Sequence, residues 1–427
     1  MSSKRSRRFF EQDDITAFIV EDVPHRPLAH VVPLRIAAAH VPRVKNLSFR
    51  CVDWTKHRPH ATFFLRLAHF DSVTLLELMS CRFASSDDLR RLTSALPSLA
   101  TLRLISIHCD SFPIRVDDRL HKQQTLLELY LQPVGDGPYD DSFLAVCRGY
   151  STLNVLVTQM QCFRTFFDLQ RLVQGFPCLT ALTLSSVSKH SIDSMDLTEP
   201  TERASSPPAV PLALVSLSLY ELEPDQVCQA LEWVSGASSA CVLEYLRIDP
   251  AEDTGALGAA IEHIVKMSGE TLNTIRLCVH EPSNGFLLVA NALEMIDLTF
   301  FVHKDSRSFD TTISIITHAL SRIFSLSLRR VILNIILPFD RFFVHEVDAS
   351  SMKAHSLDEA LSRDVFDDLP PLGALLTFTS YDDALDPILE EAMHVIPTLF
   401  ALWDARGVLE VQSPQSHPRG VFQTHGH

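Results

Sequence analysis

The sequence predicts an α/β solenoid, in which short parallel strands line the concave face and helices cover the convex face. Two observations favour this fold class. A short pattern, with apolar residues at its first, fourth and sixth positions, recurs along most of the 427 residues. The stretches between its copies carry apolar residues three or four positions apart, as in DDLRRLTSAL, which is the spacing of a helix that packs by one face.

The apolar pattern alternates with a period of two, which is typical of a half-buried strand. Its copies begin at Val44, Val73, Leu99, Leu126, Leu153, Leu179, Leu214, Leu243, Leu272, Leu293 and Leu328. Most successive starts lie 26 to 29 residues apart. A fixed period of this length indicates a stack of similar units, so we predict about 11 irregular strand-helix repeats.

Local signals mark where several of the helices should begin. Ser86 and Asp87, Asp140 and Asp141, and Asp225 stand just before helical apolar spacing. Their oxygens or negative charge satisfy the unpaired amide groups of a first helical turn.

Stacking is what makes such a unit stable. Burial of each leucine contributes about 1.5–3 kcal/mol, whereas ordering the backbone costs about 1–2 kcal/mol per residue. A single repeat leaves both of its apolar faces in water, so neighbours must cover them. Because helices are thicker than strands, we expect the stack to curve into a horseshoe.

The stretch VTLLELMSCRF, residues 73–83, matches the spelling LxxLxLxxCxL. The chain therefore resembles the leucine-rich-repeat family over roughly residues 44–336, although Cys81 is the only copy of that family's ninth-position Asn or Cys. The segments SALPSLATLRL and ARGVLEVQ are similar to segments of fungal F-box and leucine-rich-repeat proteins. This resemblance implies that the repeats select a substrate, while an F-box binds the Skp adaptor of a cullin ubiquitin ligase.

The first 43 residues depart from that pattern. They contain Pro24, Pro27, Pro33 and Pro42, which interrupt the helices of an F-box. We therefore expect no recognisable F-box, and a non-catalytic module that binds a protein partner on its concave face. One version of this function is a substrate receptor of a ubiquitin ligase. The alternatives are a stand-alone scaffold or orphan paralogue with no ligase link, and an enzyme of unrecognised type.

Composition narrows the classes of partner and compartment. The 37 basic and 52 acidic residues give a formal charge of −15, which disfavours nucleic acid and anionic membranes as partners. Nine cysteines without a CxxC pair indicate reduced thiols in an intracellular protein, cytoplasmic or nuclear. The sequence has no uninterrupted apolar run of 18 residues, so we expect no membrane span.

The sequence contains no nucleophile, phosphate-loop or dinucleotide motif, so we expect neither an enzyme nor a cofactor. Cys51, Cys81 and Cys109 each follow a predicted strand, and we interpret them as small buried fillers rather than as a row of metal ligands. His57 and His60 are interpreted as residues of a surface loop.

The predicted organisation has five parts. They are an N-terminal cap at 1–43, the repeats at 44–337 with a flexible insertion at 189–211, an acidic linker at 338–372, a capping helix and strand at 373–413, and a tail at 414–427.

The candidate site follows from the strand period. Since positions 1, 4 and 6 point into the core, positions 3, 5 and 7 face the concave side. The predicted partner-binding residues are Arg50, Glu77, Arg103, Glu128, Tyr130, Tyr220, Tyr245, Arg247, Asp249, Arg276, Asp297 and Arg330. Tyr220, Tyr245, Arg247 and Arg276 form the preferred patch, because Tyr and Arg often anchor protein interfaces. The alternative is that these residues bind no partner and are present only because an exposed strand face requires bulky, soluble side chains.

Overall fold

The computed structural model describes a set of ranges along the chain. They are residues 16–22, 27–36, 43–111, 126–133, 137–186, 212–237, 242–250, 255–279, 288–301, 309–337, 354–380 and 399–412. The predicted insertion at 189–211 and the predicted tail at 414–427 lie outside these ranges.

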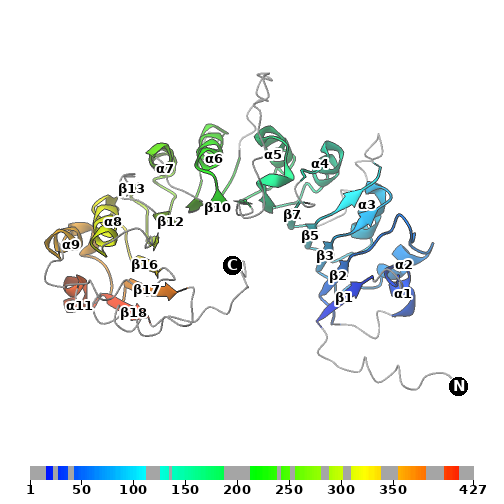
Figure 1. Cartoon of the computed structure of the whole chain (residues 1–427), viewed down its shortest axis with the longest axis horizontal. Coiled ribbons are helices and arrows are strands. Elements are labelled where there is room, and N and C mark those ends of the chain that lie inside the picture. The colour runs from blue at the N-terminus through cyan, green and yellow to red at the C-terminus, as the bar shows by residue number, and fades with distance from the viewer. Residues whose placement is uncertain are drawn as a thin grey trace, which may run out of the picture. The chain divides into compact units, whose positions relative to one another are not determined.

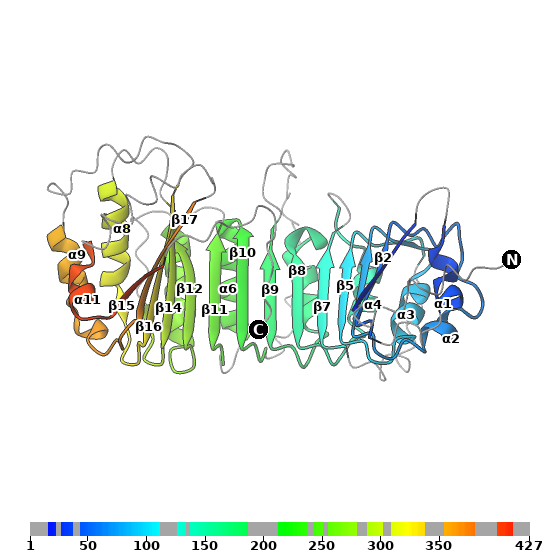
Figure 2. The same cartoon turned by 90° about the horizontal axis from the view of Figure 1, so that it is seen from below.

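The chain divides into two compact units, unit 1 (Met1–Leu214) and unit 2 (Val215–His427). Within each unit the strands lie side by side in chain order and pair in parallel (Figure 2). The helices of each unit lie on one face of its strands (Figure 1). Parallel strands that alternate with helices confirm the predicted α/β class.

Unit 1 contributes seven strands to this arrangement within the described ranges. They are β1 (Ala17–Glu21), β2 (Asn46–Arg50), β3 (Leu75–Met79), β5 (Thr101–Ile105), β7 (Glu128–Gln132), β8 (Val155–Gln159) and β9 (Ala181–Ser185). Its helices are α1 (Val32–Arg35), α2 (Phe63–Leu67), α3 (Ser86–Ser94), α4 (Asp141–Cys147) and α5 (Phe166–Val173). Strands β4 (Arg82–Phe83) and β6 (His108–Cys109) pair separately.

Unit 2 repeats the plan with seven strands in its described part. They are β10 (Ser216–Leu222), β11 (Tyr245–Pro250), β12 (Thr274–Val279), β14 (Met295–Phe301), β16 (Arg330–Leu337), β17 (Ala374–Ser380) and β18 (Leu409–Gln412). Its helices are α6 (Pro224–Ala237), α7 (Gly255–Met267), α8 (Phe309–Ser321), α9 (Ala354–Leu361) and α11 (Ala401–Ala405). Strands β13 (Leu288–Val289) and β15 (Ile323–Phe324) form a second small sheet.

The strand period of two is confirmed by burial. In β3 and β5 the leucines at 76, 78, 102 and 104 are fully buried, and the residues between them are half-buried. The register pairs Leu76 with Leu102 and Leu78 with Leu104, so the leucines form continuous rows across the strands. Each row excludes water, and its burial contributes to stability.

Strands also occur outside the predicted repeat region of residues 44–337. Strand β1 pairs with β2, so part of the predicted N-terminal cap adds a strand to the sheet. Strand β17 pairs with both β16 and β18, and helix α9 lies within the predicted acidic linker. The Trp403 indole donates to the Leu361 carbonyl at 3.3 Å, which ties α11 to α9.

Two helix starts test the predicted caps. Asp140 precedes α4 and its carboxylate accepts from the Ser142 amide at 2.7 Å, as expected. For α3, Ser86 is already the first helical residue, and the cap is Ser85, whose hydroxyl accepts from the Asp88 amide. The predicted start was one residue late because SSDD offers several competent oxygens in succession.

Three strands of unit 1 end in the same backbone conformation. Cys51, Ser80 and Ser106 have φ values of 55°, 53° and 56°, and each directly follows a strand. Their amides donate to the carbonyls of Met79, Ile105 and Gln132 on the next strand, at 2.9, 2.8 and 3.0 Å. This left-handed turn therefore adds one more main-chain hydrogen bond to the next strand, and the side chain of the turn residue takes no part in it.

The cysteines near these turns differ in environment. Cys81 and Cys109 are buried as predicted, and the Cys81 thiol donates to the Phe49 carbonyl at 3.3 Å. Burial raises the pKa of both thiols to about 12. Cys51 is exposed, so its interpretation as a buried filler was wrong. It occupies the left-handed position itself, from which its side chain points to solvent.

We predict that Ser80→Val lowers the free energy of unfolding by about 1–2 kcal/mol, because a β-branched side chain is strained at positive φ. Ser80 is exposed, so the added methyl groups meet no core atoms. Ser80→Gly, which removes the strain, is the matched control and should stay within about 1 kcal/mol of the parent. Urea unfolding measures both, and equal losses for Val and Gly would contradict the explanation.

Candidate functional site

The strand face opposite the helices is called here the open face. No helix of the described residues covers it in either unit (Figure 1). All of the predicted partner-binding residues lie on the strands, and all are half-buried except Arg330, which is exposed. Units 1 and 2 each hold one group of them.

The unit 1 group centres on a row of residues in register, Ser48, Glu77, Arg103 and Tyr130. Glu77 Oε1 accepts from the Ser48 hydroxyl at 2.9 Å and lies 3.2 Å from Nη2 of Arg50. Glu77 is therefore already neutralised by a neighbour on the same face.

Arg103 has a different kind of partner. Its Cζ lies 4.8 Å from the centre of the Tyr130 ring, so the guanidinium stacks over that ring. Burial is the main cause that raises the pKa of Tyr130, followed by the charge of Glu128, while Arg103 opposes the shift. Glu128 in turn accepts from the Thr101 hydroxyl at 3.1 Å.

The unit 2 group contains the preferred patch. Arg247 Cζ lies 4.4 Å from the centre of the Tyr220 ring, and Arg276 Cζ lies 5.9 Å from that of Tyr245. Both pairs are diagonal neighbours on adjacent strands, since Tyr220 pairs with Asp249 and Tyr245 with Thr274. The structure thus brings the four residues together as two stacked pairs. Their cation–π attraction stabilises the extended arginine side chains.

Asp297 is a largely buried charge of the open face, with 12% of its side chain exposed. It lies 3.3 Å from Nε of Arg276, and Asn334 Nδ2 donates to its Oδ1 at 2.6 Å. The Thr377 hydroxyl donates to Oδ1 of Asn334. Burial raises the pKa of Asp297 although Arg276, Arg247 and Arg330 favour its charged form.

Sequence reasoning missed Asn334 and Thr377. Asn334 is the seventh position of the last predicted repeat, and Thr377 is on β17, which the repeat pattern did not reach. The alternating stretch ALLTFTS is the signal that could have found β17.

Asp249 lies on β11 at the seventh position and is near Cys278 and Glu221. Burial is the main cause that raises the pKa of each of these two groups, and the charge of Asp249 adds to it. The open face of unit 2 therefore carries an acidic position beside its stacked arginines.

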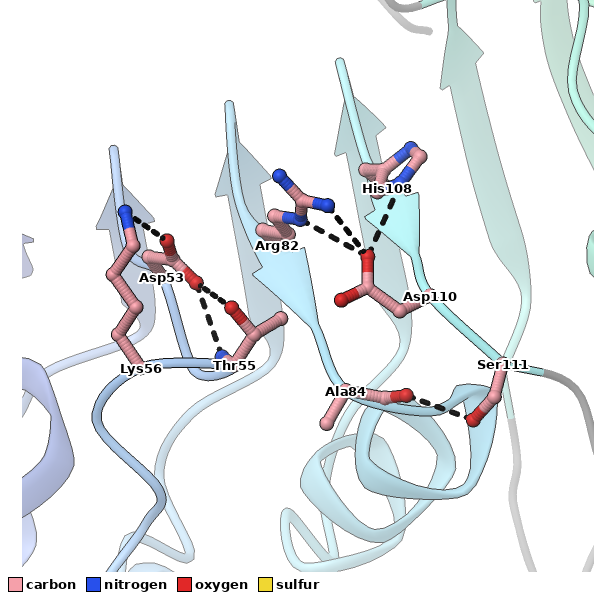
Figure 3. A network of polar contacts seen from close by, with 8 residues as sticks. All are labelled: Asp53, Thr55, Lys56, Arg82, Ala84, His108, Asp110 and Ser111. Carbon is pink, nitrogen blue, oxygen red and sulfur yellow. Dashed lines mark hydrogen bonds and ion pairs between the residues drawn. The ribbon is translucent and has the colours of Figure 1, made fainter.

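A second polar network lies in unit 1 at the turns after the strands (Figure 3). Asp110 accepts from Arg82 at 2.9 Å and lies 3.2 Å from Nε2 of His108. Asp53 pairs with Lys56 at 3.0 Å. Burial alone would raise the pKa of Asp53, but hydrogen bonds from Thr55 and Lys56 outweigh it and lower the pKa to about 2.

These turn residues balance their own charges, since each carboxylate in Figure 3 faces a cationic side chain. The network is exposed and off the open face, and it ties successive repeats together. It therefore serves as a comparison surface for experiments on the open face.

The described residues include no group of three or more His, Cys, Asp and Glu side chains placed to hold a metal ion. None of the helices in the described ranges combines the length and apolar character that crossing a membrane requires.

No protein-family model matches the chain, and no curated protein matches its sequence.

Asp297 should leave a pH signature in stability. Because its pKa is raised on folding, its favourable contribution is complete below the unfolded-state pKa and is lost as pH rises through the native value. We predict that Asp297→Asn gains stability relative to the parent as pH rises through that window.

Urea unfolding at a series of pH values measures the difference between variant and parent. Asp404→Asn, which removes an exposed carboxylate on α11, controls for the loss of one charge. A difference between Asp297→Asn and the parent that stays constant with pH would contradict the prediction.

Proposed function

We propose that this chain is a non-catalytic protein-recognition module built as a leucine-rich-repeat solenoid of about 11 irregular repeats curved into a horseshoe. Its partner binds the open face. The observation that carries the proposal is the pair of stacked Arg–Tyr contacts on strands β10, β11 and β12, on a face that no helix of the described residues covers.

The chemistry of these residues supports recognition of a protein. Tyr and Arg supply large contact areas, and they are the residue types enriched at the energetic centres of protein interfaces. An arginine that is already stacked on a tyrosine loses less conformational freedom when a partner arrives. Arg247 and Arg276 are register partners on neighbouring strands, which lie about 4.8 Å apart, so one continuous segment can contact both.

Two versions of this function differ in their link to a ubiquitin ligase. A substrate receptor would also bind the Skp adaptor of a cullin complex, whereas a scaffold or orphan paralogue would not. The described part of the first 43 residues consists of β1, the short 3-10 turn Ala29–Val31 and the four-residue α1. Because β1 pairs with β2 of the sheet, this observation favours the scaffold version.

Affinity purification from the native cell with the full chain tests both points. We predict that a Tyr220→Ala, Tyr245→Ala double variant loses at least tenfold of the partner captured by the parent, since central Tyr residues of interfaces often contribute about 2 kcal/mol or more. Recovery of the Skp adaptor and a cullin would instead favour the ligase version.

The matched control is an Arg82→Ala, His108→Ala double variant, which alters the charge-balanced network of Figure 3 away from the open face. It should capture the partner as the parent does. Circular dichroism and thermal melting establish that each variant is folded. If the tyrosine variant is folded and keeps the partner, the open face is not the binding site.

A further inference from the structure

We infer that the segment recognised by the open face carries an acidic side chain, whose carboxylate binds Arg247 on unit 2 or Arg103 on unit 1. This inference rests on the proposed function and adds the chemistry of the partner.

Both units contain the same two kinds of arginine. One kind is paired with a carboxylate of the chain, as in Arg50 with Glu77 at 3.2 Å and Arg276 with Asp297 at 3.3 Å. The other kind contacts a tyrosine ring and no carboxylate, as in Arg103 on Tyr130 and Arg247 on Tyr220. Arg276 contacts both Tyr245 and Asp297, so it belongs to the paired kind. Among the described residues, neither Arg103 nor Arg247 forms an ion pair with a carboxylate.

The stacked arginines are prepared to accept an anion. Arginine remains protonated at all physiological pH values, so each stacked guanidinium keeps its charge while half-buried. Each guanidinium carbon lies over its ring, at 4.8 Å for Arg103 and 4.4 Å for Arg247. A guanidinium has five N–H donors, and two of them can bind the two oxygens of a carboxylate. In addition, Nε of Arg103 is buried without a hydrogen-bond acceptor in the described residues.

The surrounding charges favour a single carboxylate over a denser anion. Glu77 and Glu128 lie on the strands beside Arg103, and Asp249 lies two residues from Arg247 on the same strand. The chain as a whole carries a formal charge of −15. A nucleic acid or a phosphate brings more negative charge against these groups, whereas one Asp or Glu side chain meets one unpaired arginine.

The tyrosine rings add a second requirement for the recognised segment. Tyr220, Tyr245 and Tyr130 are half-buried on the open face and present apolar ring surface beside each arginine. We therefore expect the acidic residue to stand next to an apolar one in the recognised segment.

Short fluorescein-labelled peptides test the inference with the full chain. They share one context and contain the core Leu-Glu-Tyr-Glu, Leu-Gln-Tyr-Gln or Leu-pSer-Tyr-pSer, and a labelled oligouridine is the nucleic-acid probe. Fluorescence anisotropy should show that the Glu peptide binds at least tenfold more tightly than the Gln peptide, and more tightly than the other two probes.

Variants locate the binding. Arg247→Gln and Arg103→Gln should each weaken binding of the Glu peptide, and the double variant should lose at least tenfold. Lys266→Gln is the control on unit 2, because it removes one positive charge from an exposed residue of helix α7, away from the open face. Arg82→Gln, from the network of Figure 3, is the control on unit 1. Both controls should bind within twofold of the parent.

Several results would overturn the inference. They are equal binding of Glu and Gln peptides, tighter binding of the phosphoserine peptide or the oligouridine, absence of binding to every probe, and an effect of the control variants as large as that of Arg247→Gln. If the tyrosine double variant still loses its cellular partner in those cases, the proposed function stands and only the carboxylate assignment fails. If that variant keeps its partner, the proposed function itself fails, whatever the peptides show.

Discussion

The parallel ladder between strands is the constraint on which the rest of the structure depends. Each strand pairs residue by residue with its neighbour, so Leu76 meets Leu102 and Glu77 meets Arg103. Burial of the leucine rows fixes this register, because a slip by one residue would expose them. The same register then places every intervening side chain on the open face. The packing of the core therefore determines which polar groups become neighbours.

Sequence reasoning predicted the parts of the fold that follow from period alone. The α/β class, the buried leucine rows and the set of open-face residues all depend on which residues alternate. It did not predict β1 and β17, because their apolar residues do not follow the pattern of positions 1, 4 and 6. The cap of α3 at Ser85 and the exposure of Cys51 were also predicted wrongly. The cap depends on which of several adjacent side-chain oxygens accepts the hydrogen bond, and the exposure of Cys51 depends on its backbone angles. The repeat period determines neither.

The site was predicted as a list of residues, whereas the structure adds their pairing. The sequence placed Arg247 and Arg276 on one face, but it could not distinguish an arginine stacked on Tyr220 from one paired with Asp297. That difference depends on diagonal neighbours across strands and on the burial of Asp297. The supporting residues come from later strands, since Asn334 lies 37 residues after Asp297 and Thr377 lies a further 43 residues after Asn334.

The left-handed turns after β2, β3 and β5 have a consequence for how such repeats tolerate change. Their connection to the next strand is made by main-chain amides, which every residue except proline possesses. The identity of the side chain at the turn is then constrained only by its tolerance of positive φ. Cys, Ser and Ser fill the position after three successive strands of unit 1. A parallel sheet joined in this way can accept a different side chain at each turn while its strands stay paired.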